Sequence, residues 1–583
     1  MNPPIETDLQ PSVHVLREYA LLADGERGAV VGPSGEIAWL CAPGWADGSV
    51  CNALVGGRGL YVIRPHDRYV WGGSYESGSL VWRTRWVTTD GVIECYQALA
   101  FPGAADRVVL LHRVEVTDGD AQLDLLLRPR ADHDEAPFTD VRRLDGHPHV
   151  WTGRTGDLQV RWTGPERAVG GPSEHRGEQI EASAALHAGD RLDLVLELGP
   201  HLPDHLPDPD RLWRDTRDAW RAAVPDLTVN GAPRDALHAW AVMRGLTSNR
   251  GDGMVAAATT SLPEHAEAGR NYDYRYAWIR DQCYAGCAAS AAGAPELLDA
   301  AVRFVSARVL EDGPELSPAY TVTGGRVPDQ RTLALPGYPG ADVRIGNHVN
   351  EQFQLDALGE VLRLLSTADR AGRLDDDARR AVKIAIDAVD ARWDQPDAGI
   401  WELDANWWTH SRLAAIAGLR GWHADALADR ILEATARRGT HRSGRWQRGA
   451  DDARVDAALL LGSIHGATPP SDPRNIATLE AVAAELTEDG YVYRFRPDER
   501  PLGEAEGAFT LCGFWISQAW HALDEEVTAS RWFERTRASC GPPGLLTEEV
   551  DVAERQLRGN FPQAFVHAAL LECAATLPLD DTA

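Results

Sequence analysis

The sequence predicts a multidomain β + α protein, in which an N-terminal antiparallel β-sandwich precedes a C-terminal helical barrel. In the first part of the chain, apolar or alternating runs of five to eight residues are interrupted by Gly, Asp, Asn or Pro, which is typical of strands and turns. In the second part, apolar residues recur with the 3.6-residue period of amphipathic helices. We therefore expect a β-sandwich over residues 1–205, a linker with one helix over 206–232 and a helical domain over 233–583.

The expected strands follow one another between Glu18 and Gly199, with turn residues between them. Many short strands at this spacing favour an antiparallel sandwich, and no long run with a helical period precedes Pro207. A passage rich in Pro and Asp then separates the part of the chain with a strand pattern from the part with a helix pattern. The strand segments are residues 28–43, 59–65, 79–99, 107–117, 123–131, 157–164 and 191–199.

The helical domain is predicted to contain twelve helices with Ala-rich apolar stripes and polar outer faces. This number, without a clear sequence repeat, favours a double-layered barrel of six helical hairpins, although an irregular all-α domain would also accommodate it. Loops at one end of such a barrel would form a pocket, because loops on a rigid scaffold commonly carry function. The helices are expected near 233–249, 279–292, 294–312, 348–371, 375–394, 408–420, 422–438, 452–466, 472–487, 507–524, 525–541 and 559–577.

Charge and composition restrict the partners of the protein. The net charge of −29 disfavours nucleic acid and anionic membranes, and it is compatible with a neutral substrate. The N-terminus has no basic stretch followed by an apolar one, and no apolar run reaches the roughly 18 residues that span a bilayer. The eight cysteines form no CxxC pair. We expect a cytoplasmic, reduced protein without nucleic-acid or membrane partners, and its oligomeric state, a homo-oligomer included, stays open.

One segment, "AGRNYDYRYAWIRDQCYAG" (268–286), combines four tyrosines, a tryptophan, three arginines and two aspartates within nineteen residues. A core helix would be apolar on one face, and a solvated loop would not present its aromatic rings to water. Aromatic platforms beside Arg and Asp suit a ligand with apolar ring faces and a rim of hydroxyl groups. The segment therefore indicates a sugar site.

A candidate acid lies in "DAGIWELDANWWTHSRL", where Glu402 follows Trp401 and precedes Trp407 and Trp408. Desolvation beside indole rings disfavours a charged carboxylate and should raise its pKa, so that the group can donate a proton to a leaving oxygen. A glutamate that only opens a helix beside chance tryptophans is the alternative. We count Trp401 and Trp407 among the expected substrate-binding residues.

Other acidic groups carry weaker signals. Glu548 and Glu549 are adjacent in "GLLTEEVD", so that in an extended chain only one of them faces a given pocket. Glu504 and Glu506 precede an apolar helix, where a capping role is expected for at least one of them. Asp281 also opens a helix, and it is equally compatible with a cap and with a sugar contact.

Motifs for other chemistries are absent from the sequence. We find no GxxxxGK[ST] phosphate loop, no HExxH and no GxSxG elbow. The 19 histidines are dispersed, and His147 and His149 have no third candidate ligand nearby in sequence. We therefore expect neither a catalytic metal nor a cofactor.

Taken in order, several motifs resemble glycoside hydrolase family 15, the family of glucoamylases and of certain bacterial trehalases. The resemblance extends from about Tyr19 to about Leu570. It rests on "YALLADGERGAVVGPSGEIAWLC", "AAATTSLPEHAEAGRNYDYRYAWIRD", "GYPGADVRIGNHVNEQFQLDALGEV", "GIWEL…WTHSRL", "EGAFTLCGFW" and "GLLTEEVD…GNFPQAFVHAALL". It implies a β-sandwich followed by an (α/α)6 barrel, and inverting, exo-acting hydrolysis of a small α-linked glucoside that releases β-glucose.

Carried over motif by motif, the resemblance implies that Glu402 is the general acid and Glu548 the general base. An inverting glycosidase needs an acid at the leaving oxygen and a base that activates water on the opposite ring face, with carboxyl groups roughly 6.5–9.5 Å apart. We predict that folding brings Glu402 and Glu548 into this window. The resemblance also implies that Arg280 and Asp281 grip the terminal glucose in the −1 subsite, with Tyr272 and Trp278 beside it.

The chain departs from the family pattern in ways that affect the substrate more than the chemistry. The usual "NWDYRYCWLRDA" reads "NYDYRYAWIRDQ" here, with Tyr272 in place of Trp. Further departures are Gly44, Trp45, Asn406, Trp407, Trp408, Ala277 and Gln282. Because none removes a candidate catalytic carboxylate, they leave the reaction unchanged and the leaving group, the linkage and the chain length open.

Two other functions remain as alternatives. A phosphorylase or glucosyltransferase could use the same barrel, but a phosphorylase lets phosphate attack and does not need the carboxylate base that Glu548 would supply. A non-catalytic carbohydrate-binding protein would not need the pair of carboxylates at Glu402 and Glu548.

Overall fold

The computed structural model describes residues 13–173, 176–265, 270–339 and 341–578, and the chain divides into two compact units. The β unit contains Met1–Val224, Thr332–Val343 and Gly541–Leu545. The helical unit contains Pro225–Arg331, Arg344–Cys540 and Leu546–Ala583. An antiparallel sheet domain is followed along the chain by a helical domain.

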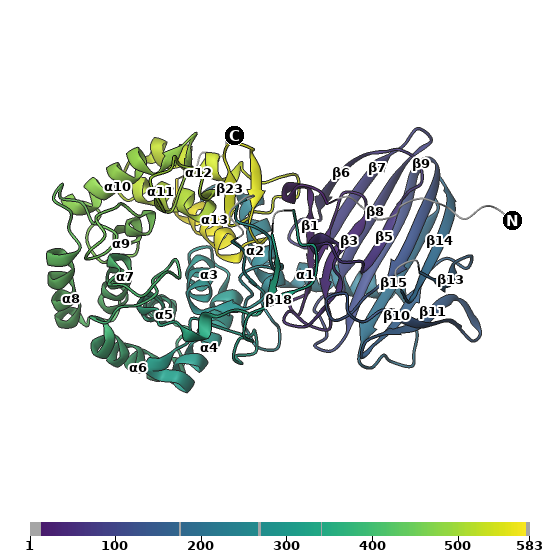
Figure 1. Ribbon diagram of the computed structural model, residues 1–583, viewed down its shortest axis with the longest axis horizontal. Helices are drawn as coiled ribbons and strands as arrows, with labels where there is room; N and C mark the ends of the chain where they lie inside the picture. Colours follow the sequence, from purple (N-terminus) through teal and green to yellow (C-terminus); the bar gives the residue numbers. More distant parts are fainter. Residues whose placement is uncertain (1–12, 174–175, 266–269, 340, 579–583) are drawn as a thin grey trace. The chain divides into compact units, whose positions relative to one another are not determined.

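The β unit contains two antiparallel sheets that share one long strand, β9 (Val108–Arg128), visible in Figure 1. The strands of the first sheet are β1 (Ala20–Ala23), β2 (Gly28–Val31), β3 (Glu36–Cys41), β4 (Ser49–Cys51), β5 (Leu60–Pro65), β13 (Val169–Pro172) and β14 (Glu178–His187). The strands of the second are β6 (Val70–Tyr75), β7 (Trp82–Val87), β8 (Gly91–Leu99), β10 (Phe138–Leu144), β11 (His147–Thr155), β12 (Leu158–Thr163) and β15 (Arg191–Gly199).

Strand β9 passes from one sheet to the other near Gly119, whose φ of 67° is unfavourable for residues with a side chain. A register shift against β8 skips Thr117, since Val92 pairs with Asp118 and Ile93 with Val116. Because side chains alternate between the two faces of a strand, one extra residue moves all the following side chains to the opposite face. The inward residues accordingly change from even to odd numbers: Val108, Leu110, Val114 and Val116, then Ala121, Leu123, Leu125 and Leu127.

All the expected strand segments form strands, and the segments 107–117 and 123–131 belong to the single strand β9. The helix expected between the domains is α1 (Pro209–Ala223), which Asp208 caps through the Arg211 amide at 3.2 Å. This helix packs within the β unit, where Trp220 stacks on Phe101 at 3.9 Å between ring centroids.

In the helical unit, six helices of the described chain contact one another in a closed sequence, and α13 returns to α3. These inner helices are α3 (Ile279–Ala291), α5 (Leu355–Arg370), α7 (Thr409–Arg420), α9 (Leu461–Ile464), α11 (Thr510–His521) and α13 (Ala564–Thr576). The helices packed outside them are α2 (Pro233–Leu246), α4 (Pro295–Asp312), α6 (Asp376–Arg392), α8 (Asp425–Arg438), α10 (Pro473–Glu485) and α12 (Glu526–Arg537). In Figure 1, α6, α8 and α10 lie at the periphery of the unit, with α5, α7 and α9 inside them.

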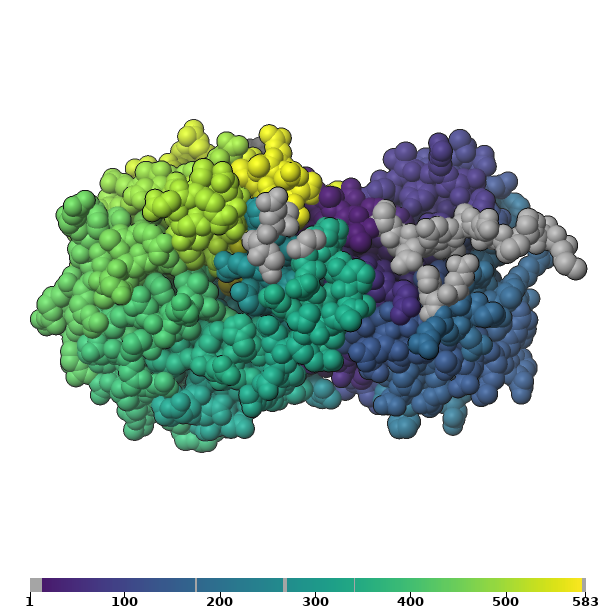
Figure 2. Space-filling model, in the orientation of Figure 1, coloured from purple at the N-terminus to yellow at the C-terminus, as the bar shows by residue number. Residues whose placement is uncertain are grey.

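The amino-acid pattern explains which helices lie inside. Inner helices such as α13, "AFVHAALLECAAT", are apolar on nearly all sides and are buried along most of their length. Outer helices such as α6, "DDARRAVKIAIDAVDAR", bury one stripe of Ala and Val and expose their charged face. In the space-filling view, segments from the whole length of the helical unit, teal to yellow, share one continuous surface (Figure 2).

The predicted helices correspond to those observed, with one difference. The helix expected over residues 452–466 is a short 3-10 helix, η5 (Ala457–Leu460), followed by the single turn α9. Short strands lie between the helices: β16 (Ala277–Trp278), β17 (Ala319–Tyr320), β18 (Arg331–Leu333), β19 (Val343–Ile345), β20 (Thr487–Glu488), β21 (Tyr491–Val492), β22 (Ala508–Phe509), β23 (Glu549–Asp551) and β24 (Gln556–Arg558). None of the eight cysteines forms a disulfide bond, and none of the described helices is long and apolar enough to cross a bilayer.

Candidate active site

Within the segment rich in aromatic and charged residues, residues 270–278 form an extended chain that leads into α3. Residues 270–276 run antiparallel to residues 256–261, joined by backbone hydrogen bonds such as that from the Ser261 amide to the Tyr272 oxygen (3.0 Å). Because side chains of an extended chain alternate, every second residue faces the same side. The residues of this face that line one pocket are Arg270, Tyr272, Tyr274, Trp278 and, at the start of α3, Arg280.

The opposite face of the segment is a structural anchor. Asp273 and Arg275 form a buried ion pair with a shortest N–O distance of 2.7 Å. Asp273 also accepts a hydrogen bond from the Gly346 amide at 3.0 Å. The alternation of the sequence thus separates residues that hold the segment in place from residues that face the pocket.

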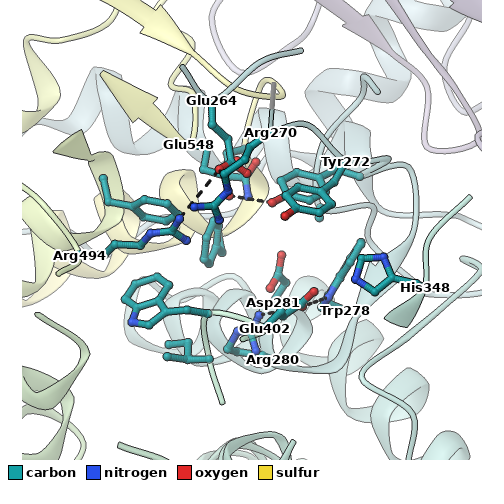
Figure 3. Close-up of a pocket in the computed structure, with 17 residues that line it drawn as sticks. Glu264, Arg270, Tyr272, Trp278, Arg280, Asp281, His348, Glu402, Arg494 and Glu548 are labelled. Atoms are coloured by element: carbon teal, nitrogen blue, oxygen red, sulfur yellow. Dashed lines mark hydrogen bonds and ion pairs between the residues drawn. The ribbon is translucent and has the colours of Figure 1, made fainter. Parts of the chain in front are cut away.

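The pocket lies within the helical unit and has about 660 Å³ of free space, its open mouth included. Figure 3 shows side chains from several separate segments converging on it. The remaining lining residues are Ala256, Glu264, Asp281, His348, Ile400, Trp401, Glu402, Arg494, Phe509, Glu548, Gln563 and Phe565.

Arg280 and Asp281, both in the first turn of α3, are buried side chains of the pocket wall. Arg280 donates to Gln354 at 2.8 Å and to Asp356 at 3.3 Å, which fixes the guanidinium. Burial raises the pKa of the Asp281 carboxyl to about 7, with Glu402 adding to the rise and Arg280 opposing it. A carboxyl of this kind can accept a hydrogen bond from a sugar hydroxyl when ionised, or donate one to it when protonated.

Glu402 projects into the pocket from a turn that precedes α7. Its φ is 54°, a left-handed conformation that a residue with a side chain adopts at an energetic cost. The turn closes through a hydrogen bond from the Glu402 amide to the Gly399 oxygen at 3.2 Å. The indole of Trp278 donates to the Glu402 carboxylate at 2.6 Å, and Arg280 lies 3.6 Å from the same oxygen.

Glu548 lies immediately before β23, which pairs with β22 and β24. The Tyr274 hydroxyl donates to the Glu548 carboxylate at 2.8 Å. Burial raises the pKa of Glu548 well above its usual range and Glu264 adds to the rise, whereas Tyr274, Arg494 and Arg270 oppose it. A buried glutamate with a raised pKa is a stronger base, once ionised, than an exposed one.

The two carboxylates are connected through two aromatic residues. Glu402 is bound by Trp278, and Glu548 by Tyr274. The rings of Trp278 and Tyr274 pack edge to face, with centroids 5.5 Å apart. The structure therefore brings the two predicted catalytic residues to one pocket, together with Arg280. The predicted separation of 6.5–9.5 Å between the carboxyl groups stays a prediction.

A second charged group lies beside Glu548. Arg494 donates to Glu506 through both Nε and Nη2, with a shortest distance of 2.7 Å. Arg270 lies 3.4 Å from Glu506 and 3.4 Å from Glu264. The positive charges of Arg270 and Arg494 therefore offset the negative charges of Glu264 and Glu506, which lowers the cost of burying these groups.

The two tryptophans predicted to bind substrate differ in their positions. Trp401 lines the pocket and donates to Asp456 at 3.0 Å. Trp407 is not among the described residues that line it, because its ring lies between Arg412 and Arg438 and its Nε1 donates to Asp394 at 2.9 Å. The indole expected beside Glu402 is instead that of Trp278.

The side chains of the adjacent Glu548 and Glu549 point in opposite directions, as expected for an extended chain. Glu548 faces the pocket, whereas Glu549 is buried on the other side and accepts from the Gly507 amide at 2.8 Å. The expected capping role of Glu504 or Glu506 is wrong, since α11 has neither an acidic residue in its first turn nor a side-chain cap. Glu506 instead pairs with Arg494, and Glu504 is exposed.

Comparisons with known proteins identify the family of this chain. The family described as "Glycosyl hydrolases family 15" matches residues 234–575. The chain belongs to glycosyl hydrolase family 15. A second family, "Trehalase-like, N-terminal", matches residues 11–199. The protein is therefore a glycoside hydrolase with a trehalase-like N-terminal domain.

The alignments with relatives of this family 15 hydrolase cover nearly the whole chain. It is 30% identical to a trehalase of Mycobacterium tuberculosis, covering 95% of this chain and 88% of that protein. It is also 30% identical to a trehalase of Mycolicibacterium smegmatis, covering 95% and 90%. A bacterial glucoamylase solved with acarbose has the same fold, with a TM-score of 0.71 at 13% identity over 99% of this chain and 97% of that one.

Some pocket residues of this hydrolase were not predicted from the sequence. Arg270 and Tyr274 could have been found from the alternation in "RNYDYRYAW", since they share a face with Tyr272 and Trp278. Arg494 comes from a segment without a distinctive pattern, and His348 lies in a quoted motif that assigned it no role, so only the fold brings them to the pocket.

Proposed function

We propose that this family 15 hydrolase cleaves a small α-linked glucoside, with α,α-trehalose as the foremost candidate, by an inverting, exo-acting mechanism. The observation that carries the proposal is the pair Glu402 and Glu548 facing one pocket, with the buried Arg280 and Asp281 in its wall. The helical contacts support the (α/α)6 barrel expected for this reaction, since six inner helices form a ring within six outer ones.

In the proposed reaction, the terminal glucose lies beside Arg280 and Asp281, which bind its hydroxyl groups. Glu402 donates its proton to the glycosidic oxygen as the bond to C1 breaks. Glu548 accepts a proton from a water molecule, whose oxygen attacks C1 from the opposite face. The leaving sugar departs with the proton of Glu402, and glucose is released with its anomeric centre inverted to β.

The identity of the substrate is supported by the relatives. Two proteins named trehalase are 30% identical to this chain, and the alignments cover 88% and 90% of them. The N-terminal match to a trehalase-like domain supports the same substrate class. A phosphorylase is disfavoured because it would not need the carboxylate base that we propose for Glu548.

Proton NMR of the first products tests the proposal. Inverting cleavage of α,α-trehalose yields one β-glucose and one α-glucose, whereas retaining cleavage yields α-glucose alone. We expect equal α and β signals before mutarotation. Initial α-glucose alone would contradict inversion, and strict consumption of phosphate with formation of a sugar phosphate would identify a phosphorylase. Binding of trehalose without turnover of any α-glucoside would identify a carbohydrate-binding protein.

A further inference from the structure

The carboxylate proposed as the acid has a positive charge close to it. The guanidinium of Arg280 lies 3.6 Å from Glu402, and Figure 3 shows both side chains, with Asp281, on one side of the pocket. A positive charge at this distance favours the ionised form of a carboxyl group, which has no proton to donate. If the proposed function holds, on which the present inference rests, Arg280 works against the acid step unless another group offsets its charge.

Asp356 lies where it can offset this charge. It stands in the first turn of α5, its side chain is fully buried, and its Oδ2 lies 3.3 Å from Nη1 of Arg280. The two terminal nitrogens of Arg280 have different partners, since Nη1 contacts Asp356 and Nη2 contacts Glu402. Asp356 is not among the described residues that line the pocket, so it acts on the acid through Arg280 and not by touching the substrate.

The neighbouring carboxyl groups outside the pocket have arginine partners of their own. Among the described residues, Arg280 is the single ion-pair partner of Asp356. Asp281 also lies beside Arg280, but it lines the pocket and faces the sugar in the proposed reaction. Asp356 is therefore the carboxyl that offsets Arg280 from outside the pocket. The other two pairs are Asp397 with Arg412 and Glu360 with Arg363.

The charge of Asp356 depends on pH. Burial raises the pKa of its carboxyl to about 7, while Arg280 opposes the rise and Asp397 and Glu360 add to it. Asp356 is therefore largely protonated at acidic pH and becomes negative as the pH rises through about 7. Since an acid is harder to keep protonated at higher pH, the negative charge develops in the range in which Glu402 needs it.

Other ionisable groups act on the same cluster from several elements. His410 is buried, and its pKa is lowered to about 3, so its ring is neutral where Asp356 titrates. The groups that act on Asp356, Arg280 or Glu402 are Asp281 and Tyr284 of α3, Glu360 of α5, His410 of α7, Asp397 before α7, and Glu264 and Tyr274 of the pocket wall.

We propose that Asp356 is a positioning residue of the acid step, which offsets the charge of Arg280 and so keeps the proton on Glu402 until the leaving oxygen takes it. Gln354 accepts a hydrogen bond from the same Nη1 of Arg280 at 2.8 Å. This neutral contact orients the guanidinium, whereas Asp356 supplies the charge. The arrangement extends the hydrolysis of sugars with poor leaving groups to higher pH.

The test exchanges the charge between the two residues that contact Nη1. Asp356→Asn removes the negative charge, and its amide oxygen can still accept from Arg280. The basic limb of kcat/KM for trehalose should move to lower pH by roughly one pH unit. Below about pH 6 the variant should match the wild type, because Asp356 is protonated there in any case. Gln354→Glu adds a charge at the same nitrogen and should move the limb to higher pH, and the double variant should bring it back towards the wild-type position.

Hydrolysis of α-D-glucosyl fluoride separates a charge effect from a displacement of Arg280. Fluoride needs little protonation to leave, whereas both substrates place the same glucose beside Arg280. Asp356→Asn should therefore retain fluoride hydrolysis at every pH. Equal losses on trehalose and fluoride across the pH range would show that Asp356 only holds Arg280 in place and would overturn the proposal, as would an unmoved basic limb.

The control is Asp124→Asn, which changes a buried aspartate of β9 that contacts His66 at 2.9 Å in the β unit. It should leave the basic limb in place. Thermal unfolding checks that each variant is folded, and Gln354→Glu carries the test independently of the stability of Asp356→Asn. An active wild type whose limb moves in neither variant would refute the role of Asp356 alone, whereas a wild type that hydrolyses no α-glucoside would refute the proposed function.

Discussion

The two candidate catalytic carboxylates are held in opposite ways. Glu402 lies on a turn with a left-handed backbone, is 23% exposed and is oriented by one indole hydrogen bond from Trp278. Glu548 lies beside a three-stranded sheet, is 5% exposed and has Tyr274 and a group of charged residues around it. The proposed acid is therefore placed by local backbone geometry, whereas the proposed base is placed by its surroundings.

This difference matches the two tasks. An acid must reach the leaving oxygen and exchange its proton with solvent after each turnover. A base must hold one water molecule against the sugar, away from bulk solvent. The comparison predicts that the two sites respond differently to the same kind of substitution.

The largest difference is expected between Glu402→Gln and Glu548→Gln. Both should lower kcat for trehalose by about 10²- to 10⁴-fold, because each removes a proton-transfer group. Fluoride needs little protonation to leave, so Glu402→Gln should still hydrolyse α-D-glucosyl fluoride, whereas Glu548→Gln should not. Steady-state kinetics with both substrates measure this. The opposite pattern would exchange the two roles.

The hydrogen-bond partners of the carboxylates provide a second comparison. Tyr274→Phe removes the hydroxyl that binds Glu548, and Trp278→Phe removes the N–H that binds Glu402. Because hydrogen bonds to charged groups contribute about 1.5–3 kcal/mol, each should lower kcat for trehalose by about 10- to 100-fold. Only Tyr274→Phe should lower fluoride hydrolysis to the same degree. Equal effects of both variants on fluoride would contradict the separate roles.

Gly559 supports Glu548 through its lack of a side chain. Its φ is 79°, and an added Cβ would lie 3.1 Å from Glu548 Oε2. Gly559→Ala should destabilise the protein by about 1–2 kcal/mol and lower kcat by about tenfold. Gly444→Ala is the control, since Gly444 has a φ of 93° but open space around it. Thermal unfolding should be affected in both variants, whereas kcat should fall in Gly559→Ala alone.

The smallest effect is expected on the pH dependence. Glu548 must be ionised to act as a base, and its pKa is raised by burial and then by the negative charge of Glu264. Glu264→Gln removes that charge and should lower the pKa of Glu548. The acid limb of kcat/KM should therefore move to lower pH, by roughly one pH unit. Glu504→Gln, which changes an exposed glutamate, should leave the limb in place, and a shift to higher pH in Glu264→Gln would contradict the charge effect.

The elements were largely predictable because their signals are local. Strands such as β15 and helices such as α6 carry their periodicity in the residues that form them, and the boundaries differ by a few residues at most for these two elements. The segment over residues 452–466 was less predictable, because its apolar run fits a helix although the structure forms only short turns there.

The site was predictable only in part. Glu402, Glu548, Arg280 and Asp281 stand in motifs that the family resemblance identifies, and they line the same pocket. Trp407 stands in one of these motifs as well, but its ring packs between two arginines. Proximity in sequence to a functional residue does not determine where a side chain points.

By itself, the sequence determined the two classes of secondary structure, the family and the carboxylates proposed for catalysis, because periodicity and motifs are properties of neighbouring residues. Only the tertiary structure decided which groups surround each carboxylate. Glu264, His348 and Arg494 reach the pocket from separate segments, and the effect of Glu264 and Arg494 on the pKa of Glu548 depends on distances that exist only after folding. Charge and burial act through space, so the proton affinity of a buried group follows from the folded arrangement.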